Sequence, residues 1–363
     1  MIMNYNKIRR NSKEIKIGRV CIGGANKIAI QSMTNTDTCD SDATISQIRA
    51  LEGRGCDIVR ITVPDVSAAD TVTKIKESGI LIPIVADIHF DYKIALKCAE
   101  LGIDKIRINP GNIGANENVK AVCKACSDKN IPIRIGVNSG SLEKSILAKY
   151  GEPNAYALAE SAMYHISLLE RYDFDNIVIS IKASNVENMI LANRILAEKI
   201  PYPIHLGVTE AGGYKSGLIK SSIGIGSLLN DGIGDTIRVS LTDDPLIEVD
   251  SAKDILNALD IEGQSGLNVV SCPTCGRTKI DLISLVKRFE EAVDKEGLRD
   301  VPLKVALMGC VVNGPGEARE ADIGIAGGKG EALLFSHGEI LRKIPEENII
   351  TELISEIKNM SKK

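Results

Sequence analysis

The feature that most restricts the fold of this chain is a regular alternation of short apolar runs with longer segments of helical periodicity. The runs are rich in Ile and Val, as buried parallel strands are, and eight of them can be counted. They cover residues 28–33, 57–63, 82–88, 105–109, 131–137, 176–183, 203–209 and 235–241. Eight strand–helix repeats predict a (β/α)8 TIM barrel. A doubly wound open sheet remains the alternative, because the pattern alone does not establish closure.

Helices are expected between these strands. The predicted helices cover residues 42–54, 66–78, 92–101, 116–129, 156–172 and 186–199. Residues 20–24 and 27–30 are expected to form a short hairpin around Gly-Gly-Ala-Asn. The glycine-rich runs 223–226 and 326–330 lack the spacing of a phosphate-binding loop, so they are predicted to be turns.

A second, smaller domain is expected after the barrel. Residues 246–260 have helical periodicity, and the charged, glycine-containing stretch 261–266 is typical of a linker. The rest of the chain is about 100 residues long, which suits a small α/β domain. We therefore predict a substrate-binding barrel in residues 1–260, a linker in 261–266 and a cysteine-bearing domain in 267–363.

Composition argues against two classes of partner. The net charge is −4 and aromatic residues make up 3% of the chain, whereas nucleic-acid binding needs a basic field and stacking rings. No apolar run approaches the roughly 20 residues that cross a membrane, and the first residues are too polar for a signal peptide. The nine cysteines are scattered and odd in number, which favours free thiols in a reducing compartment. We expect a cytoplasmic protein without a nucleic-acid or membrane partner.

Cations inside the predicted strands are the strongest functional signal in the barrel. Five strand segments carry a cation followed, two or four residues later, by a hydrogen-bonding side chain on the same strand face. The cations are Arg60, Arg107, Arg134, Lys182 and Arg238, and their polar companions include Asn138, Ser184 and Ser240. A cation in a parallel strand costs free energy unless it is paired or binds a ligand. Gathered at the carboxyl ends of barrel strands, these groups predict a site for a phosphate or diphosphate.

Two carboxylates share the predicted barrel mouth. Asp87 ends one strand segment, and Glu210 follows another just before a Gly-Gly pair. Either could act as an acid or pair with an arginine, and Glu210 is the better candidate for an acid. The alternative is that both belong to an internal ion-pair network. His89 and His205 either assist or serve as structural histidines.

Three cysteines of the second domain predict a metal site. Cys272 and Cys275 follow one apolar run, and Cys310 follows another and enters a glycine–proline loop that contains Glu317. Clustered thiolates suit zinc or an iron–sulfur cluster. Three thiolates with a carboxylate fit a four-iron cluster better than a closed zinc site. Cys123 and Cys126 form a second Cys-x-x-Cys pair, but they lie on a predicted helix and are expected to pack in the core.

These motifs resemble a known family, the 4-hydroxy-3-methylbut-2-enyl diphosphate synthases of the methylerythritol phosphate route to isoprenoids. The resemblance extends over nearly the whole chain and matches the short two-domain bacterial form. The motifs are QSMTNTDT (31–38), VADIHF (85–90), IRINPGN (106–112), GVNSGSL (136–142), HLGVTEAG (205–212), SCPTCGR (271–277) and NGPGEA (313–318).

The resemblance implies a reaction and a role for each candidate residue. The reaction would be the two-electron reductive opening of 2-C-methyl-D-erythritol 2,4-cyclodiphosphate to (E)-4-hydroxy-3-methylbut-2-enyl diphosphate. A [4Fe–4S] cluster would be held by Cys272, Cys275, Cys310 and Glu317, and the diphosphate by the five cations with Asn138, Ser184 and Ser240. Glu210 would donate a proton with Asp87 in support. Flavodoxin or ferredoxin would deliver the electrons to a homodimer, in which the cluster domain of one subunit closes over the barrel mouth of the other.

Two other hypotheses fit parts of the pattern. One is a (β/α)8 phosphate-ester lyase or transferase, similar in its barrel to pteroate synthases, with a zinc-bearing tail. The other is a non-enzymatic iron–sulfur sensor or carrier, which leaves the five strand cations and Glu210 without a chemical purpose.

Overall fold

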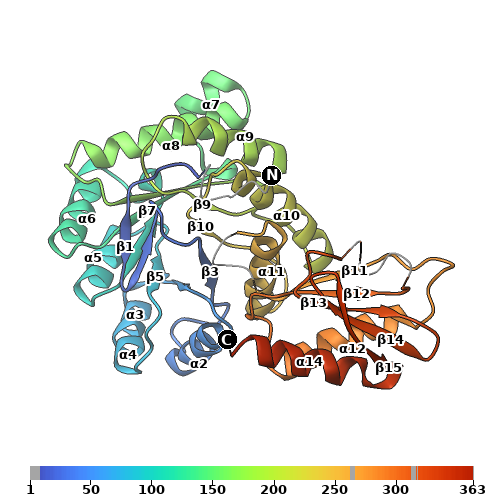
Figure 1. The fold of residues 1–363 in the computed structure, drawn as a ribbon. Helices are drawn as coiled ribbons and strands as arrows, with labels where there is room; N and C mark the ends of the chain where they lie inside the picture. Colours follow the sequence, from blue (N-terminus) through green and yellow to red (C-terminus); the bar gives the residue numbers. More distant parts are fainter. Residues whose placement is uncertain (1–8, 262–265, 312–315, 317, 363) are drawn as a thin grey trace. The chain divides into compact units, whose positions relative to one another are not determined.

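The first unit of the protein is a parallel eight-stranded barrel surrounded by helices (Figure 1). The structure is a computed structural model that describes residues 9–261, 266–311, 316 and 318–362. The chain divides into two compact units, Met1–Ile255 and Leu256–Lys363.

The barrel strands occur where the apolar runs predicted them. They are β3 (Ala29–Met33), β4 (Ile58–Thr62), β5 (Ile84–Asp87), β6 (Lys105–Ile108), β7 (Ile133–Asn138), β8 (Ile177–Lys182), β9 (His205–Leu206) and β10 (Thr236–Ile237). The hydrogen-bonded order is β8-β7-β6-β5-β4-β3-β10-β9, and a parallel bridge between Ile179 and Ile204 joins its two ends. The predicted TIM barrel is therefore confirmed, and the open sheet is not observed.

Several helices around the barrel begin at a residue whose side chain caps the first turn. The helices of this unit are α2 (Ser41–Gly53), α3 (Val66–Ala69), α4 (Thr71–Glu77), α5 (Tyr92–Glu100), α6 (Asn116–Asp128), α7 (Lys144–Tyr150), α8 (Ala155–Glu170), α9 (Val186–Ala197), α10 (Tyr214–Asn230) and α11 (Pro245–Ala258). Short 3-10 turns η1 (Pro110–Asn112) and η2 (Ser139–Ser141) follow β6 and β7. Asp40, Asp91, Asn154 and Asn185 each accept a backbone N–H in the first turn of their helix. Side-chain oxygens at this position satisfy N–H groups that the helix itself leaves unpaired.

In α6 the predicted packing of Cys123 and Cys126 is confirmed, since both are buried.

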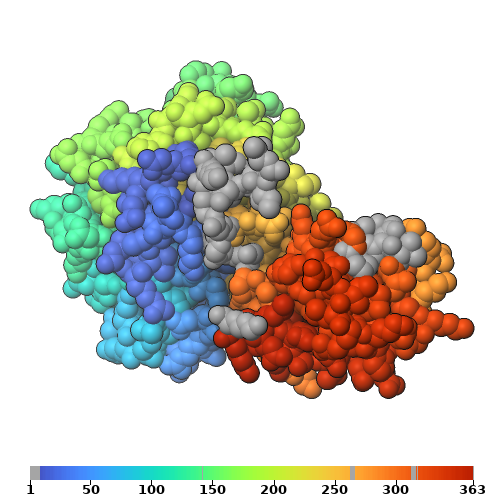
Figure 2. All heavy atoms as spheres, viewed as in Figure 1, coloured from blue at the N-terminus to red at the C-terminus, as the bar shows by residue number. Residues whose placement is uncertain are grey.

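A hairpin forms near the N-terminus, but residues 20–22 pair with the preceding segment and not, as was predicted, with residues 27–30. The hairpin consists of β1 (Ile15–Ile17) and β2 (Val20–Ile22), turned at Gly18, whose φ is +54°. Ile15, Ile17 and Ile22 pack on apolar residues near the amino ends of the barrel strands. In the space-filling view, this N-terminal segment (blue) lies over the barrel strands and hides them (Figure 2). The buried isoleucines close the floor of the barrel.

The glycine-rich run 223–226 is helical and does not form a turn, so that prediction was also wrong. It lies inside α10, where Gly224 faces β9 and its neighbours. A Cβ atom at Gly224 would come within 2.8 Å of Val208 Cγ2. The glycine allows the helix to pack closely on the barrel, and this packing outweighs its low helix propensity. Run 326–330 divides between a strand end and a turn.

The second unit is a five-stranded mixed sheet with two long helices on one face. The sheet runs in the order β11 (Asn268–Ser271), β12 (Lys304–Met308), β13 (Ile323–Gly327), β14 (Glu331–Ser336) and β15 (Glu339–Pro345). The helices are α12 (Leu282–Lys295) and, after the 3-10 turn η3 (Glu346–Asn348), α14 (Ile349–Met360). β11, β12 and β13 are parallel, and the last two pairings are antiparallel. Phe289 of α12 and Leu353 of α14 belong to the core on the helix-covered face.

Candidate functional site

The barrel interior brings the five predicted cations together. Arg60 lies on β4, Arg107 on β6, Arg134 on β7 and Lys182 on β8, and Arg238 follows β10. Arg60, Arg107, Arg134 and Lys182 are each at most 8% exposed. Burial lowers the pKa of Lys182, and the charges of Arg60, Arg134, Arg238 and Arg107 lower it further, as expected for groups that share one cavity. The structure thus gathers cations that are far apart in the sequence.

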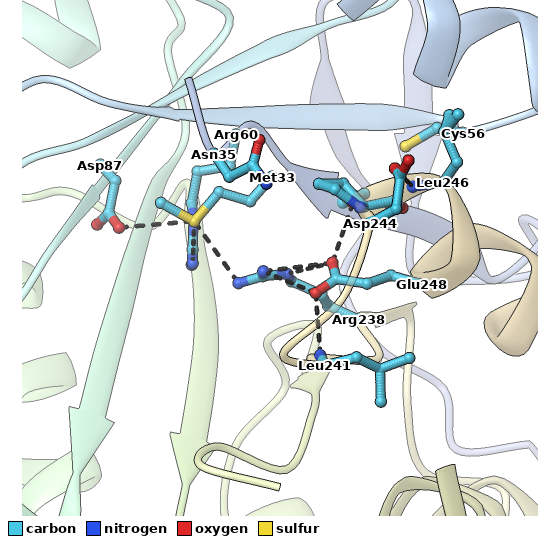
Figure 3. A network of polar contacts seen from close by, with 12 residues as sticks. Met33, Asn35, Cys56, Arg60, Asp87, Arg238, Leu241, Asp244, Leu246 and Glu248 are labelled. Carbon is cyan, nitrogen blue, oxygen red and sulfur yellow. Dashed lines mark hydrogen bonds and ion pairs between the residues drawn. The ribbon is translucent and has the colours of Figure 1, made fainter. Parts of the chain in front are cut away.

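Asp87 at the end of β5 ties two of these arginines together. Its Oδ1 lies 3.0 Å from Arg107 Nη1. Its Oδ2 lies 3.5 Å from Arg60 Nε (Figure 3). Burial alone would raise the pKa of Asp87, but the charges of Arg60, Arg107 and Arg134 outweigh it and hold that pKa well below its usual range. The carboxylate is therefore ionised at neutral pH, and it orients the two guanidinium groups.

Two further charged residues at this site did not stand out in the sequence. Lys105 begins β6 and is fully buried, with Nζ 3.4 Å from Gln31 Oε1. Glu248 lies in the first turn of α11, is 4% exposed, and binds the guanidinium of Arg238. Strand periodicity could have identified Lys105, since it lies two residues before Arg107 on the same face. No comparable signal distinguishes Glu248 from the other acids of its helix.

The site holds more positive than negative charge. Among the described residues, no carboxylate forms an ion pair with Lys182 or Arg134. Arg134 Nε and Nη1 and Arg107 Nε are buried without a hydrogen-bond partner in the described part of the chain. Buried cations without counter-charges are costly, and a bound anion would remove that cost. The arrangement fits a ligand that carries several negative charges.

Gly136 on β7 provides the space that Arg107 occupies. A Cβ atom at this position would lie 2.6 Å from Arg107 Nε and 2.7 Å from its Nη2. Distances this short force the guanidinium to move, and its pairing with Asp87 is then lost.

A Gly136→Ala substitution is therefore expected to weaken the binding of inorganic diphosphate by about 10- to 100-fold. Loss of a hydrogen bond to a charged group costs about 1.5–3 kcal/mol, which corresponds to that change in affinity. Isothermal titration calorimetry measures it. Gly53→Ala is the matched control, because a Cβ there meets nothing within 4 Å, and it should leave the affinity unchanged. Equal affinities for the two variants would contradict the assigned role of Gly136.

The predicted polar companions of the cations lie at or just after the carboxyl ends of three barrel strands, β7, β8 and β10. Asn138 is the last residue of β7 and lies opposite Lys182 in the β7–β8 register. Its side-chain oxygen, with the amide turned to satisfy both ends, accepts a hydrogen bond from Arg107 Nη2 at 3.3 Å. Ser240 is half-buried after β10, and Ser184 is exposed after β8. All three are placed at the carboxyl ends of barrel strands, where barrel enzymes bind their substrates.

Glu210 has a backbone conformation that is unusual for its residue type. It is exposed in the loop after β9, and its φ is +53°, in the left-handed region. A non-glycine residue in this region costs free energy, and such residues cluster at functional sites. The observation supports a functional role for the exposed carboxylate.

The two histidines have different surroundings. His89 is exposed, and its Nε2 lies 3.4 Å from Arg107 Nη1. His205 is fully buried, with Nδ1 2.8 Å from Thr236 Oγ1. Burial, reinforced by the charges of Arg134 and Lys182, keeps the pKa of His205 well below its usual value. His205 is therefore neutral, and only His89 reaches the open part of the site.

In the second unit, the three cysteines lie after neighbouring parallel strands. Cys272 comes directly after β11, and Cys310 comes after β12 with only Gly309 between them. The Gly309 N–H donates to Cys272 Sγ at 3.3 Å. Hydrogen bonds from the backbone and side chain of Arg277 lower the pKa of the exposed Cys275 thiol. All three thiols are free. Glu317, the fourth predicted ligand, lies outside the described residues.

The three described cysteines are donors of the type that iron–sulfur clusters take. Across the described ranges, no three His, Cys, Asp or Glu side chains gather closely enough to hold one ion. In a four-iron cluster each thiolate binds a different iron, so the sulfur atoms do not converge on one point. Hydrogen bonds to the sulfurs and partial solvent exposure, both present here, are features that tune such clusters. The described cysteines therefore fit a cluster.

Comparison with known proteins covers both units. Residues 12–253 match the GcpE TIM-barrel domain, and residues 268–359 match the GcpE protein C-terminal domain. A protein of Clostridium perfringens is 56% identical over 352 residues, which are 97% of this chain and 99% of that protein. A protein of Fusobacterium nucleatum is 55% identical over 346 residues, 95% of this chain and 96% of that one. Both relatives are named 4-hydroxy-3-methylbut-2-en-1-yl diphosphate synthase (flavodoxin).

Solved structures with a similar shape are more distant. The dihydropteroate synthase of Yersinia pestis has a TM-score of 0.49 and 11% identity, and covers 67% of this chain and 96% of its own. That of Xanthomonas albilineans in complex with 7,8-dihydropteroate also has a TM-score of 0.49, with 12% identity over 69% of this chain and 99% of its own. These likenesses are low, whereas the two family matches cover both units of the chain. The chain belongs to the GcpE family.

Proposed function

We propose that the chain catalyses the reductive ring opening of 2-C-methyl-D-erythritol 2,4-cyclodiphosphate to (E)-4-hydroxy-3-methylbut-2-enyl diphosphate, with release of water. The observation that carries this proposal is the excess of buried barrel cations over carboxylates, with Arg134 and Lys182 forming no ion pair among the described residues, which calls for a multiply charged anion. Family membership and the shared name of the close relatives supply the identity of that anion. The enzyme is thus an oxidoreductase of isoprenoid precursor synthesis.

In this proposal the barrel holds the diphosphate and manages the protons. Arginine forks suit phosphate oxygens, and buried cations bind them strongly in the low dielectric of the barrel. The diphosphate ligands are Arg60, Arg107, Arg134, Asn138, Lys182, Ser184, Arg238 and Ser240. With the charged end fixed, binding energy orients the reacting carbon. Glu210 donates the proton, and ionised Asp87 supports it by keeping Arg60 and Arg107 in place.

The domain of residues 267–363, reached through the linker 261–266, would hold the redox group. Cys272, Cys275, Cys310 and Glu317 are the proposed ligands of a [4Fe–4S] cluster. Such a cluster supplies electrons one at a time and acts as a Lewis acid toward oxygen. A carboxylate binds iron less strongly than a thiolate, so Glu317 is the ligand that can give up its position.

Flavodoxin is the proposed electron donor, because the names of the close relatives carry that word. A homodimer in a cytoplasmic setting is part of the same proposal, and size-exclusion chromatography with light scattering tests the dimer. Within the described residues, no helix is long and apolar enough to cross a membrane.

Anaerobic purification followed by iron and sulfide analysis tests the function. The expected result is about four iron and four sulfide per chain and turnover of the cyclic diphosphate with a strong reductant. Zinc without iron would favour the lyase or transferase with a zinc tail. A reconstituted but inactive iron–sulfur protein would favour a sensor or carrier.

Replacement of Glu317 by alanine is expected to preserve part of the cluster and to remove most of the turnover. Three thiolates can still bind the cluster, whereas the exchangeable ligand is lost. Iron content and steady-state rate measure the two effects separately. Full activity in the Glu317→Ala variant would refute the assigned role, and the exposed Glu320→Ala serves as a nearby control.

A further inference from the structure

Among the described residues, the Glu248 carboxylate contacts Arg238, the Leu241 N–H and the Ser32 hydroxyl. Its Oε2 lies 3.3 Å from both Nε and Nη2 of Arg238, and its Oε1 lies 3.3 Å from Arg238 Nη2 (Figure 3). The Leu241 N–H donates to Oε1 at 3.0 Å, and the Ser32 hydroxyl donates to Oε2 at 3.1 Å. One carboxylate thus connects α11, β3 and the loop that follows β10.

The pairing occupies one edge of the Arg238 guanidinium. The Nε and Nη2 edge faces Glu248, while Nη1 has the Met33 sulfur at 3.6 Å. Arg60 approaches the same sulfur, with Nη2 at 2.7 Å and Nε at 3.1 Å. Met33 therefore separates the two guanidinium groups, and Glu248 fixes the direction in which Arg238 Nη1 points.

The charge of Glu248 is unfavourable for an anion site. A carboxylate buried beside Arg238 repels an incoming diphosphate, so charge alone would make its removal improve binding. Orientation has the opposite effect, because an arginine fork held in place loses less side-chain entropy when it binds phosphate. The two effects predict changes of opposite sign, which makes them separable by experiment.

We propose that Glu248 is a positioning residue that holds Arg238 ready for the diphosphate and fixes the loop carrying Ser240 and Leu241. The inference rests on the proposed function only in requiring that the barrel mouth bind a diphosphate. Glu248 does not touch the ligand in this scheme. It acts through Arg238, and the benefit of orientation exceeds the repulsion.

The test is the affinity of the full-length protein for inorganic diphosphate, measured by calorimetry for the Glu248→Gln variant. Glutamine removes the charge and one acceptor while keeping the size. We expect binding about tenfold weaker, the equivalent of one lost charge-assisted contact. In turnover assays KM should rise by a similar factor, with kcat changed less. Unchanged or tighter diphosphate binding would overturn the proposal.

A matched control separates positioning from general stability. Asp250 lies on the same helix and forms a bidentate pair with Arg54, with both contacts at 2.6 Å. Asp250→Asn should lower the melting temperature without changing diphosphate affinity. If Asp250→Asn weakens binding as much as Glu248→Gln does, the effect is structural and the proposal fails.

A double-mutant cycle identifies the residue through which Glu248 acts. In an Arg238→Gln background, the Glu248→Gln change should no longer weaken diphosphate binding, whereas independent, additive losses of affinity would overturn the proposal. Diphosphate binding that depends on Glu248, in a protein that does not turn over the cyclic diphosphate, would defeat the proposed function and leave this inference standing. Failure of the wild type to bind inorganic diphosphate would overturn both.

Discussion

Replacement of Cys275 by alanine is expected to abolish turnover of the cyclic diphosphate and to lower the iron content well below about four atoms per chain. Cys275 is exposed, and hydrogen bonds from Arg277 favour its thiolate, which is the form that binds iron. Its loss leaves too few thiolates to retain the cluster. Iron and sulfide analysis, together with the visible absorption of the anaerobic protein, measures the effect.

The control for this variant is Cys39→Ala, which removes an exposed cysteine from the barrel unit. Iron content and turnover should match those of the wild type. Far-ultraviolet circular dichroism should show that both variants are folded. A Cys275→Ala protein with a full complement of iron and sulfide would show that this cysteine is not a ligand.

The second large effect is expected at Glu210. Glu210→Gln should lower kcat by about 10²- to 10⁴-fold, the usual contribution of a general acid, and should leave diphosphate affinity nearly unchanged. Glutamine keeps the size and hydrogen-bonding capacity of the side chain but has no proton to transfer. Single-turnover kinetics with the reduced enzyme, alongside binding measurements, separates the two quantities.

Asp173 offers a matched control for Glu210. It is also an exposed carboxylate with a left-handed backbone, at φ +54°, and it lies in the loop before β8 at the opposite end of the barrel strands. Asp173→Asn should have wild-type kinetics. Equal losses of kcat in the two variants would mean that the effect is not specific to the carboxyl group of Glu210 and would contradict its role as the proton donor.

The barrel was predictable because its pattern is local and repeated. Each strand is a short apolar run and each helix has its own periodicity, so eight repeats reinforced one another. The errors arose where packing at a distance decides the outcome. Gly224 is accepted inside α10 because Val208 and the side chains of α9 leave no room for a side chain there, and the hairpin is set by the burial of Ile15 and Ile17 on the barrel floor.

The residues of the candidate site were predictable only where a charged side chain interrupts an apolar stretch of sequence. A cation in an apolar strand, such as Arg134, stands out because such a residue needs a reason to be buried. Glu248 does not stand out, since an acid on an amphipathic helix is ordinary. Its importance comes from the approach of α11 to Arg238, which depends on the closed barrel and has no trace in local sequence.

The floor formed by β1 and β2 covers one end of the barrel and so sets the direction from which a ligand enters. With Ile15, Ile17 and Ile22 packed beneath the strands, an apolar layer separates the barrel interior from solvent at that end, so a charged ligand reaches the buried cations from the opposite end. The attraction on an approaching anion therefore increases along a single direction, toward Arg134. A molecule charged at one end enters with that end leading, and its carbon skeleton comes to rest nearest the opening.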